Sequence, residues 1–182
     1  MNTYQRLPIS FSRGEGAWLF DLEGNRFLDA LCGISVTNLG HCHPTITSAI
    51  QQQAEQLVHT SNLYHIPPQQ QLASKLCEIS GMDNVFFSNS GAEANEAAIK
   101  VARRYFYSIG KPYKNRILCV KNSFHGRTIA AIFASGSKKM TEGFGPKVGG
   151  FDHFKFGDHQ SLKKAISNKT AAIMVEPIMG EG

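Results

Sequence analysis

The apolar residues early in this 182-residue chain fall into short groups separated by polar and turn-forming residues. Two short apolar stretches flank Glu23-Gly24-Asn25, and this pattern predicts a β-hairpin over residues 17–29. Further along, apolar side chains recur every three or four positions. That spacing predicts helices over residues 45–58 and 69–80.

Later in the chain the apolar residues form continuous runs, which are typical of strands covered on both faces in α/β proteins. They predict strands at residues 85–87, 117–120 and 171–175. Helical spacing returns between them, over residues 92–107 and 159–167. Alternation of strand and helix predicts an α/β fold whose neighbouring strands are parallel.

Composition narrows the class of protein. With 42% hydrophobic and 18% charged residues, the chain has the make-up of a soluble globular domain. No stretch is apolar over the length that a membrane span needs, and residues 1–16 lack the pattern of a signal peptide. The four cysteines include no C-x-x-C pair, which favours reduced thiols. We therefore expect a cytoplasmic protein without a membrane partner.

Charge is uneven along the chain, because residues 100–169 hold fifteen Lys and Arg but three Asp and Glu. Such a region can attract nucleic acid or an anionic ligand. Most of these lysines stand singly between apolar residues, as on a solvated face, and no nucleic-acid motif accompanies them. We expect no nucleic-acid partner. We also expect no metal at Gly40-His41-Cys42-His43, since these side chains are too closely spaced for a usual zinc site.

The stretch Ser88–Glu96 joins a predicted strand to an alanine-rich helix. Ser90 and Glu93 have the spacing of a capping box, in which each side chain binds a free backbone N–H of the first turn. Gly91 and Ala92 add no bulk there, so the exposed N–H groups and the helix dipole favour a phosphate. A well-capped helix that binds nothing explains the same residues equally well.

Two further stretches follow predicted strands. In the first, Phe124 can stack on a planar cofactor and Arg127 can bind a carboxylate through two parallel hydrogen bonds. Taken alone, a core phenylalanine and a surface arginine are the commoner outcome. In the second, Glu176 and Glu181 lie in a glycine-containing loop and can orient a cofactor or substrate, although an ordinary exposed loop has the same composition.

In their order along the chain, these stretches resemble the class III aminotransferases, of ornithine and acetylornithine type, in the fold-type I pyridoxal-phosphate family. The resemblance runs the whole length. The residues that carry it are Gly16–Asp21, Gly24–Asp29, Gly40–Pro44, Ser61–Tyr64, Ser88–Glu96, Phe124–Thr128 and Val175–Gly182.

The resemblance implies a role for each candidate residue. Ser90, Gly91 and Ala92 would hold the phosphate of pyridoxal 5'-phosphate, and Phe124 would stack on its ring. Arg127 would bind the substrate α-carboxylate. Glu181 would be the gate that discriminates between the amino donor and glutamate or 2-oxoglutarate.

The resemblance also implies an architecture. Residues 1–45 would be a short hairpin segment of a small domain, and residues 46–182 would be part of a large cofactor-binding domain. That domain has a mostly parallel sheet with helices on both faces, and the full-length family member is a homodimer. The lysine that binds the cofactor covalently would lie beyond Gly182. No catalytic residue is therefore implied within the chain, and the chain alone is expected to be inactive.

Residues 33–40 look like the acetylornithine and succinylornithine enzymes, since no tyrosine stands early in this stretch. This favours exchange of an amino group between N-acetylornithine and 2-oxoglutarate, in arginine biosynthesis. Met179 stands where the family usually has glutamine. The alternatives are ornithine, 4-aminobutyrate or aminomutase chemistry, a non-catalytic phosphate-binding fragment, and a decayed fragment without function.

Overall fold

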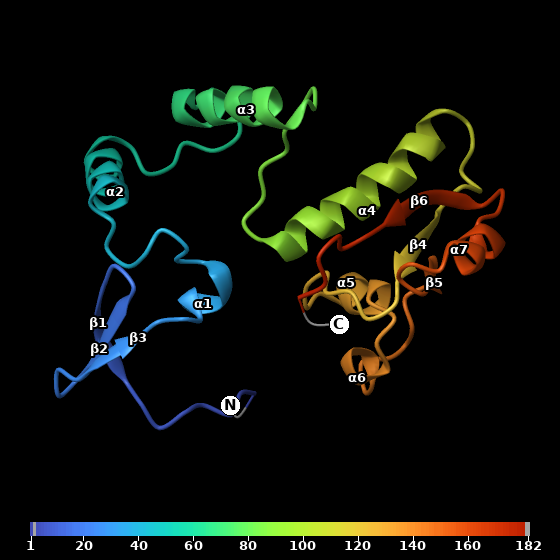
Figure 1. The fold of residues 1–182 in the computed structure, drawn as a ribbon. Helices are drawn as coiled ribbons and strands as arrows, with labels where there is room; N and C mark the ends of the chain where they lie inside the picture. The colour runs from blue at the N-terminus through green and yellow to red at the C-terminus, as the bar shows by residue number, and fades with distance from the viewer. Residues whose placement is uncertain (2, 181–182) are drawn as a thin grey trace. The chain divides into compact units, whose positions relative to one another are not determined.

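The computed structural model describes residue 1 and residues 3–180. The chain divides into two compact units, Met1–Ser80 and Gly81–Gly182. Each unit is described by itself (Figure 1). The domain division that the resemblance implies, at residue 45, stays a prediction.

The first unit contains a three-stranded antiparallel sheet in the order β1-β2-β3. Its strands are β1 (Phe11–Glu15), β2 (Trp18–Asp21) and β3 (Arg26–Leu28). Strands β2 and β3 form the predicted hairpin, and the Asp21 carboxylate closes its turn by accepting hydrogen bonds from the N–H and the side-chain amide of Asn25 at 2.8 and 2.9 Å. Strand β1 was not predicted, because polar residues and a glycine hide its pattern.

The helices of this unit are α1 (Cys32–Ser35), α2 (Pro44–Gln56) and α3 (Pro67–Ser80). The predicted helices over residues 45–58 and 69–80 are confirmed as α2 and α3. Each begins slightly earlier than predicted, at a proline, which suits a first helical turn because it needs no backbone N–H there. Neither helix has a buried residue.

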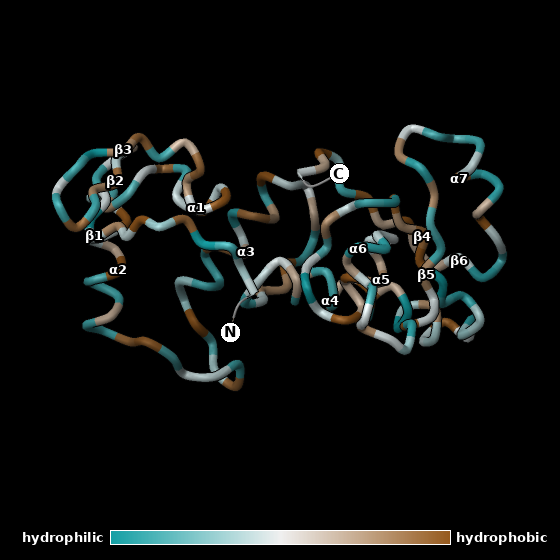
Figure 2. The backbone as a smooth tube through the Cα atoms, turned by 90° about the horizontal axis from the view of Figure 1, so that it is seen from below, coloured by the Kyte–Doolittle hydropathy of each residue, from teal (hydrophilic) through white to brown (hydrophobic). Residues whose placement is uncertain are grey.

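The second unit is built on a parallel three-stranded sheet in the order β5-β4-β6. The strands are β4 (Arg116–Val120), β5 (Phe151–Phe154) and β6 (Thr170–Met174). Residues 117–120 of the central strand are at most 2% exposed, and Figure 2 shows this strand in brown. The predicted strands at 117–120 and 171–175, and their parallel pairing, are confirmed.

Strand β5 was not predicted, because Asp152 and His153 interrupt its apolar residues. The structure gives both side chains partners. Asp152 forms an ion pair with Arg116 on the neighbouring strand. The Nε2 atom of His153 lies 3.1 Å from the carbonyl oxygens of Phe133 and Ala134. Strand β5 is therefore part of the buried sheet although two of its residues are polar.

Helices cover both faces of this sheet (Figure 1). They are α4 (Gly91–Ser108), α5 (Ile129–Ala134), α6 (Lys138–Thr141) and α7 (His159–Ala165). One apolar cluster joins Ile117 and Cys119 to Ile99 of α4 and to α5. A second cluster joins Leu118 and Val120 to α7. Alternate residues of a strand face opposite sides, so α4 and α5 lie on one face and α7 on the other.

The predicted strand at residues 85–87 is wrong. These residues form no strand and pair with none among the residues that the structure describes, and Phe86 is 79% exposed. A strand is held by hydrogen bonds to a neighbour, and an apolar run by itself does not supply that neighbour.

As for membrane association, none of the helices in the described part of the chain is long and apolar enough to cross a bilayer.

Candidate functional site

Three sequence stretches meet at the carboxyl edge of the second unit's sheet. Strands β4 and β6 run parallel, so the loops that follow them leave from the same edge, where α/β proteins bind ligands. The N–H of Phe124, after β4, donates to the Glu176 carboxylate, after β6, at 2.9 Å. The side-chain amide of Asn95 on α4 donates to the His125 carbonyl at 2.8 Å. The structure thus brings together the loops that the sequence singled out.

The start of α4 is capped by Ser90, whose backbone is extended. Its hydroxyl accepts a hydrogen bond from the N–H of Glu93 at 3.1 Å, as predicted. The second predicted hydrogen bond of the capping box, from the Ser90 N–H to the Glu93 carboxylate, is wrong. The Glu93 carboxylate accepts from the N–H of Asn89 at 2.7 Å and from its side-chain amide at 3.0 Å, not from Ser90. Asn89 donates two hydrogen bonds to the same Glu93 oxygen, from its N–H and from its side-chain amide, whereas Ser90 has a single backbone N–H to donate.

The first turn of α4 leaves donors free. Among the described residues, the N–H groups of Gly91 and Ala92 have no hydrogen-bond acceptor. A Cβ atom added to Gly91 would meet no atom within 4 Å, so the space beside this residue is open. Free N–H groups at the positive end of a long helix, with open space beside them, fit a phosphate group.

Gly126 fixes the loop after β4 against α4. Its φ angle is +119°, and a Cβ atom there would lie 2.7 Å from the Cβ of Ala92. Beyond the glycine, the Thr128 hydroxyl donates to the Glu96 carboxylate at 2.5 Å. The close approach of Gly126 to Ala92 explains why a small residue stands at position 92. It also holds the loop that carries Phe124 against α4.

Phe124 and Arg127 are both exposed, which contradicts the plainer interpretation of Phe124 as a core residue. Phe124 is 37% exposed, and the Arg127 guanidinium carbon lies 5.6 Å from the centre of the Phe124 ring. An accessible aromatic face beside an accessible guanidinium can receive a planar ligand and a carboxylate.

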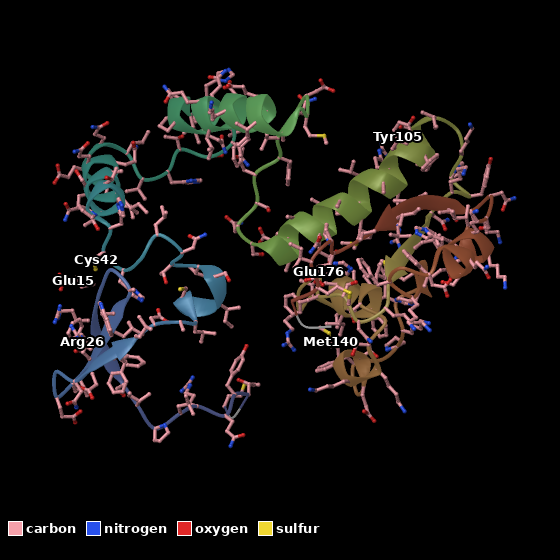
Figure 3. All side chains as sticks on the ribbon, viewed as in Figure 1. Glu15, Arg26, Cys42, Tyr105, Met140 and Glu176 are labelled. Atoms are coloured by element: carbon pink, nitrogen blue, oxygen red, sulfur yellow. The ribbon has the colours of Figure 1, made fainter. Side chains whose placement is uncertain are left out.

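Glu176 ties two loops together, a role that the sequence did not reveal. Besides the Phe124 N–H, its carboxylate accepts a hydrogen bond from the N–H of Gly180 at 3.2 Å. Figure 3 labels Glu176 in the part of the unit that holds α5. Removing this carboxylate would free both loops. The other predicted glutamate, Glu181, lies outside the described residues.

His125 was also missed by the sequence interpretation. It is 4% exposed, and its Nε2 atom has no hydrogen-bond partner among the described residues. Burial lowers the pKa of the His125 imidazole, while the nearby Glu176 carboxylate opposes this change. Burial thus favours the neutral form of the His125 ring. The only signal for this residue in the sequence was a histidine between an aromatic residue and a glycine.

Comparison with known proteins identifies the family. Residues 1–182 match Aminotransferase class-III. The chain belongs to the class-III aminotransferase family. This family uses pyridoxal phosphate, and the resemblance seen in the sequence is confirmed.

Among curated members of the family, the acetylornithine aminotransferase of Agrobacterium fabrum is 55% identical over 181 residues. The match covers 100% of this chain and 45% of that protein, so the chain spans about half the length of the curated relatives it matches.

Among solved structures, an ornithine aminotransferase from Toxoplasma gondii is 34% identical, with a TM-score of 0.93 over 99% of this chain and 43% of that one. A second structure of the Toxoplasma enzyme, with a TM-score of 0.92 and 34% identity, is described as having partial occupancy of PLP at the active site. It likewise covers 99% of this chain and 43% of that one. These likenesses agree with the predicted fold-type I architecture.

Proposed function

We propose that the full-length protein transfers an amino group between N-acetylornithine and 2-oxoglutarate, using pyridoxal phosphate. The observation that carries the proposal is the meeting of three groups at one sheet edge: the open first turn of α4, the exposed Phe124 ring and the exposed Arg127 guanidinium. The choice of donor is supported by the 55% identity to an acetylornithine aminotransferase.

Each residue then has a chemical task. Ser90, Gly91 and Ala92 hold the cofactor phosphate, since the N–H groups of Gly91 and Ala92 are free and the helix dipole favours an anion. The Phe124 ring would stack on the cofactor ring. Arg127 binds a substrate carboxylate, and Glu181 is the proposed gate between the two substrates.

The cofactor, when bound, supplies an electron-withdrawing ring and carries the amino group between substrates. The chain contributes positioning. Glu176 keeps Phe124 in place by accepting its N–H, and the Gly126 contact with Ala92 keeps the loop on α4. Reacting groups held in a fixed geometry lose less entropy on reaching the transition state.

The proposal includes the wider organisation that the family implies. Residues 1–45 belong to a small domain and residues 46–182 to the large one, and the protein acts as a cytoplasmic homodimer in arginine biosynthesis. No lysine among residues 1–182 has the family's cofactor-binding motif around it. We therefore propose that residues 1–182 alone do not catalyse amino transfer.

Ornithine is the second candidate donor. It is favoured by the likeness to the Toxoplasma ornithine aminotransferase, at a TM-score of 0.93. The lower identity of 34%, against 55% for the acetylornithine enzyme, places this candidate second.

A donor panel tests the proposal. The full-length protein, loaded with cofactor, is supplied with 2-oxoglutarate and with acetylornithine, ornithine or 4-aminobutyrate, and glutamate formation is followed. We expect kcat/KM for acetylornithine to exceed the other values at least tenfold, about 1.4 kcal/mol of transition-state binding. Turnover of ornithine or 4-aminobutyrate without turnover of acetylornithine would overturn the donor assignment. Cofactor binding without any turnover would favour a non-catalytic phosphate-binding protein.

A further inference from the structure

A cavity of about 390 Å³ adjoins Phe124 and Arg127 on the second unit. Its wall comes from two segments: the loop after β4, and the segment of α6 with the turn that follows it. Met140, one of its apolar residues, is labelled in Figure 3. The lining residues are Asn122, Ser123, Phe124, Arg127, Ser137, Lys139, Met140 and Phe144.

The polar part of the cavity is cationic. Arg127 and Lys139 both line it, and no carboxylate does. Among the described residues, neither cation has an ion-pair partner; the ion pairs recorded there involve other side chains. Two cations in one cavity repel each other, and an anion between them removes that repulsion.

Neutral donors accompany the cations. The side chains of Asn122 and Ser137 line the cavity and make no hydrogen bond to other described residues. A carboxylate has two oxygens with about four lone-pair sites, so a guanidinium that binds it through two parallel hydrogen bonds leaves sites for further donors. Lys139 and these neutral donors lie in the cavity wall where they can fill those sites.

We infer that Lys139 is a second cation of the substrate-carboxylate subsite and shares one substrate carboxylate with Arg127. The inference rests on the proposed function, which assigns Arg127 to that carboxylate. The apolar side chains of Phe124, Met140 and Phe144 line the remaining wall and suit the methylene groups of an amino-acid or oxo-acid chain. Lys139 is therefore a residue that sets affinity for the substrate acid.

Succinate is the probe, because it carries carboxylates but neither the amino nor the oxo group that transfer requires. Its binding to the cofactor-loaded full-length protein is measured by calorimetry. We expect Lys139→Gln to weaken succinate binding about tenfold, the effect of losing one charge-assisted hydrogen bond. Lys139→Arg should retain most of the affinity, because it keeps the charge and the donors.

Lys138→Gln is the matched control. Lys138 is the neighbouring residue of α6, it is also exposed, and it does not line this cavity. The Lys138→Gln variant should change succinate affinity less than twofold. In turnover, Lys139→Gln should raise KM for 2-oxoglutarate and leave kcat nearly unchanged, since a binding contact present throughout the reaction affects KM alone.

Equal succinate affinity in Lys139→Gln and Lys138→Gln would overturn the inference, and so would failure of succinate to bind the unaltered protein. These results are distinct from a failed donor assignment. A protein that rejects acetylornithine but binds succinate through Lys139 would contradict only the proposed donor.

Discussion

His125 shows how a single buried side chain links the site to pH. His125 is 4% exposed, and its Nε2 atom has no hydrogen-bond partner among the described residues, so the charged imidazole is poorly solvated and its pKa is lowered. In the unfolded chain the same ring takes up a proton near its ordinary pKa of about 6.5. As the pH falls below that value, the unfolded state binds the proton first, and stability is lost.

A His125→Gln variant should therefore be less sensitive to acid. We expect its thermal midpoint to fall less than that of the unaltered protein between about pH 7.5 and about pH 5.5, since the variant has no imidazole to protonate in the unfolded state. His159→Gln is the control, because His159 is exposed at the start of α7. An equal fall of the thermal midpoint in all three proteins would contradict the role given to burial at His125.

At the scale of elements, the junction between α4 and the loop after β4 determines the site. The sequence indicated both the helix start at Ser90 and the chemistry of Phe124 and Arg127. It did not indicate that Gly126, with a φ of +119°, packs directly on Ala92. Such a contact joins residues far apart in the sequence, and no local pattern contains it.

Gly126→Ala tests this junction. The added methyl group would lie 2.7 Å from the Cβ of Ala92, in a backbone conformation that alanine rarely adopts. We expect a loss of stability of about 1–3 kcal/mol, the usual cost of overpacking, together with weaker cofactor binding. Denaturant unfolding and cofactor titration measure the two effects.

Gly91→Ala provides the contrast. The same methyl group would meet nothing within 4 Å there, and alanine is the better helix former by up to about 1 kcal/mol. Its unfolding should match or slightly exceed that of the unaltered protein. If Gly126→Ala unfolded like Gly91→Ala, the close packing of the loop on α4 would be disproved.

Helices and strands were predicted correctly where the local pattern of apolar residues was sufficient to identify them. The helices α2, α3 and α4 and the strands β4 and β6 have clear apolar spacing, and their parallel pairing followed from their order. Prediction failed at Val85-Phe86-Phe87, where an apolar run has no strand partner among the described residues, and at β5, where polar side chains hid a buried strand. Both failures concern strand pairing, which the local sequence pattern does not contain.

At the scale of the whole molecule, the described candidate residues all lie in the second unit, Gly81–Gly182. This unit also contains the basic stretch noted in the sequence. Part of that excess is structural, as with Arg116 and its partner Asp152. Another part, Arg127 and Lys139, faces the cavity beside Phe124. We propose an anionic small molecule as the partner of these two cations.

In the proposed site, the start of α4 and the loop after β4 bind the cofactor together. A crystal structure of the full-length protein with pyridoxal phosphate tests this arrangement most directly. We expect the phosphate to accept hydrogen bonds from the N–H groups of Gly91 and Ala92 and the Phe124 ring to lie against the cofactor ring. A phosphate bound away from the first turn of α4, or a cofactor ring that does not contact Phe124, would contradict the account.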